Sequence, residues 1–155
     1  MDEQVLWEGS PSLIIGFEAF VGYGFLILIL FILGVSVNFI FIILMLISLV
    51  GPLIKYLQIK SVKYKLTTER LMISRGILDI RKDQVELYRI KDTTLDTPFL
   101  YRLFKVGNIL LKSSDKSHPN ITLLAVSEPE KISENIRHYV ETQRDKKRVR
   151  EVDVE

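Results

Sequence analysis

The sequence predicts an α+β membrane protein, in which a hairpin of two transmembrane helices carries a small, mostly β domain. Two observations lead to this prediction. No Asp, Glu, Lys or Arg lies between Glu18 and Lys55, and the 36 residues of that stretch are mostly large and apolar. From residue 61 onward, apolar and polar residues alternate as they do in half-buried strands.

The uncharged stretch is too long for one membrane crossing. Its 36 residues would make about 54 Å of helix, whereas a hydrocarbon core of about 30 Å needs only about 20 residues. With the flanking apolar residues, we expect a transmembrane hairpin over residues 13–57. Its turn is expected near residues 34–38, where small and polar residues cluster. Gly16, Gly22 and Gly24 would let the two helices pack closely.

Charge is distributed unevenly along the chain. All 21 Lys and Arg residues lie at or after Lys55 together with 15 of the 19 acids, which gives this part a charge of +6 and the preceding part −4. Lys60, Lys63 and Lys65 also lie near the end of the second helix. The positive-inside rule therefore places this end in the cytoplasm. We expect a multi-pass protein of the cytoplasmic membrane, with both termini and the soluble domain inside and the turn outside.

Two residues near the first helix have alternative interpretations. Glu18 lies within two turns of the helix start, so we expect it at the membrane interface rather than buried in the bilayer. Trp7 precedes the apolar run and is predicted to be an interfacial anchor, with a plug in the soluble domain as the alternative. Residues 1–12 would then form a cytoplasmic arm.

The soluble domain is predicted over residues 58–142 and begins with strands. Residues 62–66 alternate, with Lys63 and Lys65 on the polar face. A second strand is expected from residue 71 through 80, with an interruption at Arg75-Gly76. Residues 85–90 form a further predicted strand.

The second half of this domain combines helices and a hairpin of strands. Pro98 is expected to open a short helix capped by Asp96 or Thr97. Residues 109–111 and 121–126 are predicted strands joined by a polar loop. The sequence Ser-Glu-Pro-Glu at 127–130 has the form of a capping box. The apolar stripe of the helix that follows consists of Ile132, Ile136 and Val140. Antiparallel strands closed by one C-terminal helix outline a pleckstrin-homology-like barrel.

Four segments make this resemblance more specific. They are YKLTTERL at 64–71, SRGIL at 74–78, VELYRIKD at 85–92 and LYRLFKVG at 100–107. In this order they resemble the bacterial pleckstrin-homology (YdbS-like) family of membrane proteins, as does the opening LWEGSPS. The resemblance extends to about Thr142, although Lys105 stands where the family usually has Gly. It implies a membrane-tethered pleckstrin-homology-like domain, and no catalytic residues come with it.

Motifs for chemistry are nearly absent from the sequence. The chain has no cysteine and only two histidines, His118 and His138, which we expect at the surface rather than at a metal. The soluble carboxylates alternate with Lys and Arg, as on a solvated strand face. The sequence therefore predicts no catalytic residues, metal site, cofactor or small-molecule substrate, and we do not expect an enzyme.

Basic residues near the membrane are the candidate ligands of lipid headgroups: Lys55, Lys60, Lys63, Lys65 and Arg70. Phosphoinositide-binding pleckstrin-homology domains use a long basic loop between their first two strands. Taking residues 67–69 as that connection leaves no room for such a loop. The charged tail at 143–155 has five basic residues in seven at 144–150, but no aromatic residue is interleaved for base stacking. We interpret it as a solvated helix extension and expect no nucleic-acid partner.

These features favour a noncatalytic module that assembles with a protein partner or a second copy at the cytoplasmic membrane face. The alternative is a sensor of anionic phospholipid headgroups. An enzymatic function would instead require a polar pocket with perturbed carboxylates.

Overall fold

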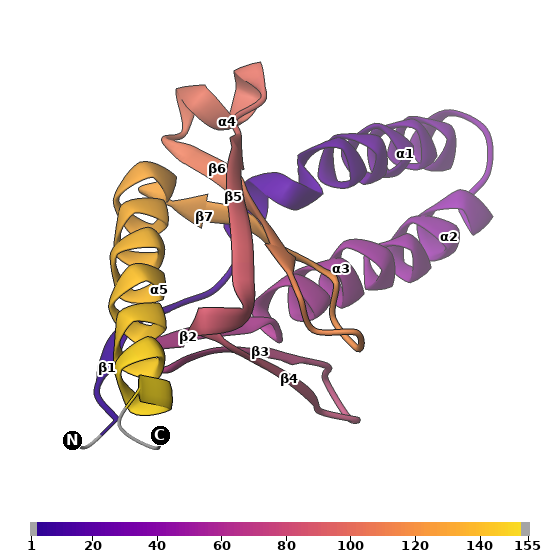
Figure 1. The fold of residues 1–155 in the computed structure, drawn as a ribbon. Helices are drawn as coiled ribbons and strands as arrows, with labels where there is room; N and C mark the ends of the chain where they lie inside the picture. The colour runs from indigo at the N-terminus through magenta and orange to yellow at the C-terminus, as the bar shows by residue number, and fades with distance from the viewer. Residues whose placement is uncertain (1–2, 153–155) are drawn as a thin grey trace.

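The computed structural model describes residues 3–152, with side chains described as far as Lys147. A helical hairpin projects from a domain of two antiparallel sheets and a long C-terminal helix (Figure 1). The four-stranded sheet has the order β1-β2-β3-β4 and the three-stranded sheet the order β5-β6-β7. Their bounds are β1 (Val5–Gly9), β2 (Lys63–Thr67), β3 (Arg70–Arg75), β4 (Arg81–Glu86), β5 (Ile90–Asp96), β6 (Val106–Ser113) and β7 (Asn120–Ser127).

The hairpin consists of the 3-10 turn η1 (Leu13–Gly16) and the helices α1 (Phe17–Ser36), α2 (Ile40–Ser48) and α3 (Val50–Lys60). Its two helical segments, Leu13–Ser36 and Ile40–Lys60, are each long and apolar enough to cross a membrane. Only 6% and 0% of their most apolar windows is buried. In the turn between them, the Asn38 side-chain oxygen accepts a hydrogen bond from the Ile40 N–H at 3.0 Å.

The second helical segment is not continuous, although the sequence suggested a single helix. It changes from α2 to α3 at Leu49. Pro52 follows three residues later, and a proline ring cannot accommodate a regular helical carbonyl four residues before it, here that of Ser48. The Ser48 hydroxyl donates to the Met45 carbonyl at 2.7 Å. Pro52 therefore accounts for the break.

Glycines let the helices of the hairpin approach each other, but of the three glycines expected to do so only one lies at a helix contact. A side chain at Gly16 would overlap a side chain of α3. Nothing lies within 4 Å of where a Cβ would stand at Gly22 or Gly24, so these two do not pack the hairpin. Gly34 and Gly51 do, since a side chain at either would overlap the facing helix.

The segment expected to be an N-terminal arm contains β1, which pairs with β2 in the register Glu8↔Lys65 and Gly9↔Tyr64. The whole hairpin is therefore inserted between the first two strands of the sheet. Taking residues 67–69 as the connection between the first two strands was wrong, because those residues join β2 to β3. Five residues without clear alternation gave no strand signal for β1.

Trp7 lies on β1, half-buried against the core, with its ring stacked on Tyr64 at a centroid distance of 6.3 Å. This is the position of a plug in the soluble domain. The role of Trp7 as an interfacial anchor stays a prediction.

Two predicted strands end earlier than expected. β3 ends at Arg75 because Gly76 has φ +123°, a conformation that favours glycine, and residues 76–80 form the loop to β4. The predicted strand at 85–90 is divided by the 3-10 turn η2 (Leu87–Arg89). This turn carries the chain from the four-stranded sheet into the three-stranded one.

The core lies between the two sheets and helix α5 (Pro129–Val152). Tyr64 and Leu66 are buried while Lys63 is exposed, which confirms the predicted alternation of β2. The α5 stripe of Ile132, Ile136 and Val140 is also buried as predicted. The remaining buried members of the core cluster are Leu71, Ile73, Val85, Leu87, Ile90, Ile109, Leu111, Ile121, Leu123 and Val126.

Neither predicted helix cap forms. The short helix α4 (Phe99–Leu103) follows Pro98 without a side-chain cap, and the Asp96 carboxylate in β5 accepts a hydrogen bond from Asn108 instead. Ser127 is the last residue of β7, one residue too early to cap α5. Glu128 turns the chain with φ 50°, and its carbonyl accepts the Ile132 N–H at 3.3 Å.

Helix α5 continues as far as Val152 through the segment 143–155 that was predicted as a charged tail, and the last three residues of that segment lie outside the described part of the chain. Gln143 donates to the Thr68 carbonyl at 2.8 Å, Arg144 donates to the Ile90 carbonyl, and the Lys147 ammonium lies 3.3 Å from the centroid of the Tyr88 ring. The first turns of this segment are therefore docked on the domain.

The stacking of Trp7 can be tested by its effect on stability. We expect Trp7→Ala to lower the free energy of unfolding by about 1–3 kcal/mol, because it removes a large half-buried ring that covers the core. Val5→Ala is the control on the same strand, at a side chain that is 51% exposed, and should cost less than about 0.5 kcal/mol. Denaturant unfolding of the full chain in detergent measures both. Equal losses would contradict the packing role.

Candidate functional site

A groove of about 500 Å³ lies where α3 meets the four-stranded sheet. We call it the basic groove. Its lining comes from the end of α3, from β2, and from the hairpin of β3 and β4: Leu57, Lys60, Ser61, Lys63, Ser74, Gly76, Ile77, Ile80 and Lys82.

Strand register places two of the lysines of the basic groove on one face. Lys63 pairs with Ser74, and Ser74 pairs with Lys82, so these side chains form a row across β2, β3 and β4. Lys60 ends α3 just before this row. All three lysines are exposed, and none of them takes part in the ion pairs among the described residues. The groove therefore presents three positive charges that no ion pair among the described residues neutralises.

The other predicted headgroup ligands lie apart from the groove or are already paired. Lys65 is 2.9 Å from a Glu8 carboxylate oxygen. Arg70 Nε is 3.0 Å from a Glu3 carboxylate oxygen, without the alignment of a hydrogen bond, and stands at the opposite end of β3 from the groove. Lys55 is half-buried on α3. The structure thus brings together only Lys60 and Lys63 of the predicted set.

Lys82 is the member that sequence reasoning missed. It lies in a run of alternating charges and was interpreted as part of a solvated strand face. Its place beside Lys63 depends on the pairing of β2, β3 and β4. A turn between β3 and β4 at Gly76 would have fixed the register of these two strands, and that register places Lys82 opposite Ser74.

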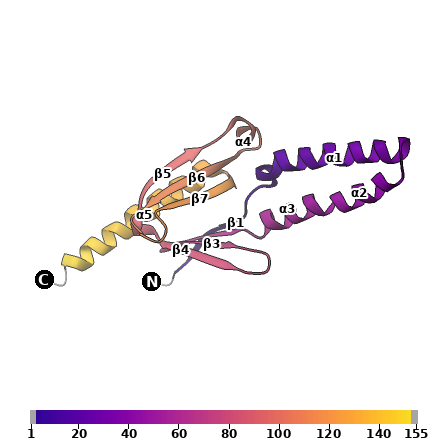
Figure 2. The ribbon, with the colours of Figure 1, turned by 90° about the vertical axis from the view of Figure 1, so that its right-hand side faces the viewer.

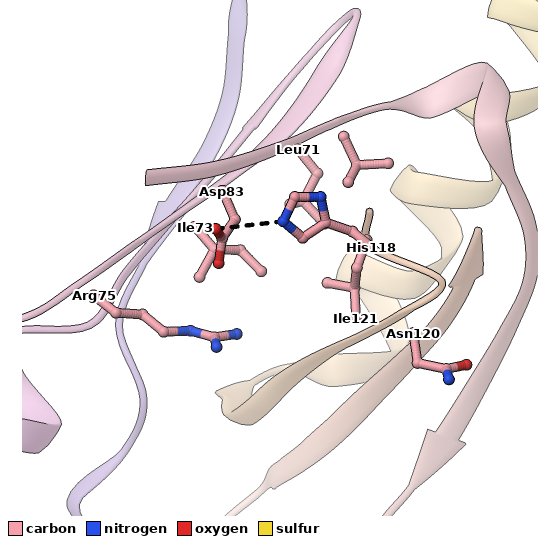
Figure 3. A pocket seen from close by; sticks show the side chains of 8 residues that line it. Leu71, Ile73, Arg75, Asp83, His118, Asn120 and Ile121 are labelled. Carbon is pink, nitrogen blue, oxygen red and sulfur yellow. Dashed lines mark ion pairs between the residues drawn. The ribbon is translucent and has the colours of Figure 1, made fainter. Parts of the chain in front are cut away.

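A second, smaller pocket of about 80 Å³ lies between the sheets (Figure 3). The His118 imidazole points toward Asp83 there, with Nε2 3.4 Å from a carboxylate oxygen. Asp83 comes from β4 and His118 from the loop between β6 and β7, so the pair joins one sheet to the other. The His118 side chain is therefore 36% exposed and contacts the Asp83 carboxylate.

The interior offers little chemistry. In the described part of the chain, Thr67 and Ser133 are the buried polar residues, and the core cluster is otherwise aliphatic apart from Tyr64. The Tyr64 hydroxyl accepts the Leu124 N–H at 3.0 Å, and burial raises the pKa of this phenol, which keeps it protonated. Among the residues that the structure describes, no group of three His, Asp or Glu side chains is arranged to hold a metal ion.

Comparison with known families identifies the class of this chain. A family model described as "Bacterial PH domain" matches residues 18–140. The chain therefore belongs to the bacterial pleckstrin-homology-domain family, whose domains are typically noncatalytic modules. No curated protein and no solved structure is similar enough to count as a match. Lys105, where the resemblance to the family leads us to expect Gly, has φ 52°, a backbone conformation that glycine adopts without strain.

Proposed function

We propose that this chain is a noncatalytic pleckstrin-homology-like module, anchored in the cytoplasmic membrane by its hairpin and acting in protein interaction or assembly. The observation that carries the proposal is the surface of the hairpin. Its side chains are mostly apolar, and only 6% and 0% of its two most apolar windows is buried, whereas apolar side chains of the adjoining domain are packed around a core. Water is a poor solvent for such a surface, so lipid is the environment that suits it.

The charges at the base of the hairpin support a cytoplasmic position for the domain. Lys55 and Lys60 lie on α3, and Lys63 follows at the start of β2. The turn around Asn38 has no charged residue. Positive charges at one end of a hairpin and none at the other favour retention of the charged end inside.

Single cysteines test this topology, because the natural chain has none. We expect Asn38→Cys, in the turn, to react with a membrane-impermeant maleimide added to intact cells. Ser117→Cys, exposed in the loop between β6 and β7, should react only after the cells are permeabilised. The reverse pattern would place the domain outside, and labelling of neither residue after permeabilisation would contradict their exposure.

Strand edges are the surfaces that support an interaction role. Within the described chain, β1 and β4 are the edge strands of one sheet and β5 and β7 those of the other, and each pairs on one side only. Their outward N–H and C=O groups can accept a further strand from a partner protein or a second copy.

Cross-linking in native membranes tests this role. We expect cross-linking followed by affinity purification to recover the chain in a complex, either with itself or with a specific protein. Gln84→Pro, on the β4 edge, should reduce the yield if β4 carries the contact, because proline removes an N–H. Recovery of monomer alone from native membranes would rule out the assembly role.

Binding of anionic lipid is the second candidate function, and the basic groove favours it. Three lysines that form no ion pair among the described residues line the groove at the end of α3, which would lie at the membrane surface. Each lysine near a negatively charged leaflet contributes about 1 kcal/mol of attraction.

Charge reversal in the groove tests this alternative. Native mass spectrometry of the full chain in detergent with added phosphatidylglycerol should show at least about tenfold less bound lipid for Lys60→Glu/Lys63→Glu/Lys82→Glu. The control is Lys91→Glu/Lys112→Glu/Lys116→Glu, which reverses three exposed lysines elsewhere. Similar losses in both variants, or none in either, would remove the groove as a lipid site.

A further inference from the structure

Two short segments of the domain expose large apolar side chains at the surface. One is the loop 76–80 between β3 and β4, where Leu78 is 94% exposed with Ile77 and Ile80 beside it. The other is α4 and the residue after it, where Phe99 is 79% and Leu103 71% exposed. We call these segments the two apolar tips. Exposed large side chains in clusters mark interaction surfaces more often than isolated ones do.

The two apolar tips lie at the base of the hairpin, on opposite sides of it. Figures 1 and 2 show α4 near the start of α1, on one side of the hairpin, and the β3–β4 loop near the end of α3, on the other side. The C-terminal end of α5 lies at the far end of the molecule (Figure 2). Specific contacts agree with this arrangement. Ile77 and Ile80 share the basic groove with Leu57 of α3. Burial raises the pKa of Tyr101 in α4, and the negative charges of Glu18, at the start of α1, and Asp96 add to this effect.

Basic residues flank both apolar tips. Arg75 and Arg81 stand directly opposite each other where β3 and β4 enter the loop, an arrangement that repels unless an anion is close. Arg102 and Lys105 accompany α4 and are exposed. Apolar side chains next to cationic ones are the pattern of segments that enter the headgroup and upper acyl region of an anionic bilayer.

We propose that the two apolar tips insert into the interface of the same membrane that the hairpin crosses, as a second and third point of contact beside it. This inference rests on the proposed membrane anchoring. The occupant is the bilayer rather than a second protein, because the tips lie on both sides of the hairpin base, where lipid surrounds the helices. Three contacts in one plane fix the tilt of the domain and turn the basic groove toward the headgroups.

Depth measurements on single cysteines test the proposal. Leu78→Cys and Phe99→Cys would each be labelled with an environment-sensitive fluorophore in the full chain, reconstituted in phosphatidylcholine–phosphatidylglycerol vesicles. Lipids that carry a quencher near the headgroup should quench both labels several-fold more than a label at Ser117→Cys. Leu28→Cys, on the exposed face of α1, tests whether the hairpin lies in the bilayer. A label at this position should be quenched by lipids that carry the quencher deep in the acyl chain. Fluorescence of the single tryptophan, Trp7, checks that each variant is folded.

The outcomes separate this inference from the proposed function. In one outcome, the Leu28 label is quenched but the labels at Leu78 and Phe99 are as accessible to water as the label at Ser117. This result would overturn the contact of the two apolar tips with the membrane and leave the anchoring intact. No quenching at Leu28 would overturn the anchoring. Protection of the Leu78 and Phe99 labels in lipid-free detergent at high protein concentration, with no lipid quenching, would show contact between copies and would also overturn the inference.

Discussion

The pairing of β1 with β2 holds the rest of the structure in place, because these strands enter and leave the helical hairpin. Gly9 and Tyr64 stand opposite each other in the ladder, and only short connections separate the strands from the helices. The entrance is fixed further by the Ser12 N–H, which donates to the Ala125 carbonyl in β7 at 2.8 Å. Short connections between paired strands leave the helices little freedom to swing. The direction of the hairpin relative to the domain is therefore set by the sheet. A membrane that held the hairpin would for the same reason also orient the domain.

The basic groove is a product of the same arrangement. The end of α3 delivers Lys60 next to the strand that begins with Lys63, and the ladder adds Lys82 from two strands away. Collecting like charges without acids costs free energy in the isolated protein. The neighbouring pairs of Lys65 with Glu8 and Arg70 with Glu3 show that the fold neutralises such charges elsewhere. An anionic surface at this end would offset that cost, and phospholipid is the anionic surface that a domain anchored as proposed would meet there.

The sequence predicts those parts of the fold whose signal is local. A long uncharged apolar run specifies the hairpin, alternation specifies β2, and the spacing of Ile132, Ile136 and Val140 specifies the buried face of α5. Features that depend on distant pairing were missed. The five residues of β1 do not alternate clearly between apolar and polar. The apolar residues at 77–80 belong to an exposed loop because Gly76 turns the chain. The position of Lys82 beside Lys63 depends on the register of three strands, so the sequence predicted only Lys60 and Lys63 of this group.

The place of the hairpin within the sheet also imposes an order on biosynthesis. β1 is made before the hairpin and β2 after it, so the four-stranded sheet cannot close until both helices have left the ribosome. In a chain that inserts as proposed, the helices reach the membrane before β2, the partner strand of β1, has been synthesised. The domain folds only after that, since domains fold as units once their elements are complete. Anchoring would then precede folding, and no folded but unanchored form of the domain would arise on the way.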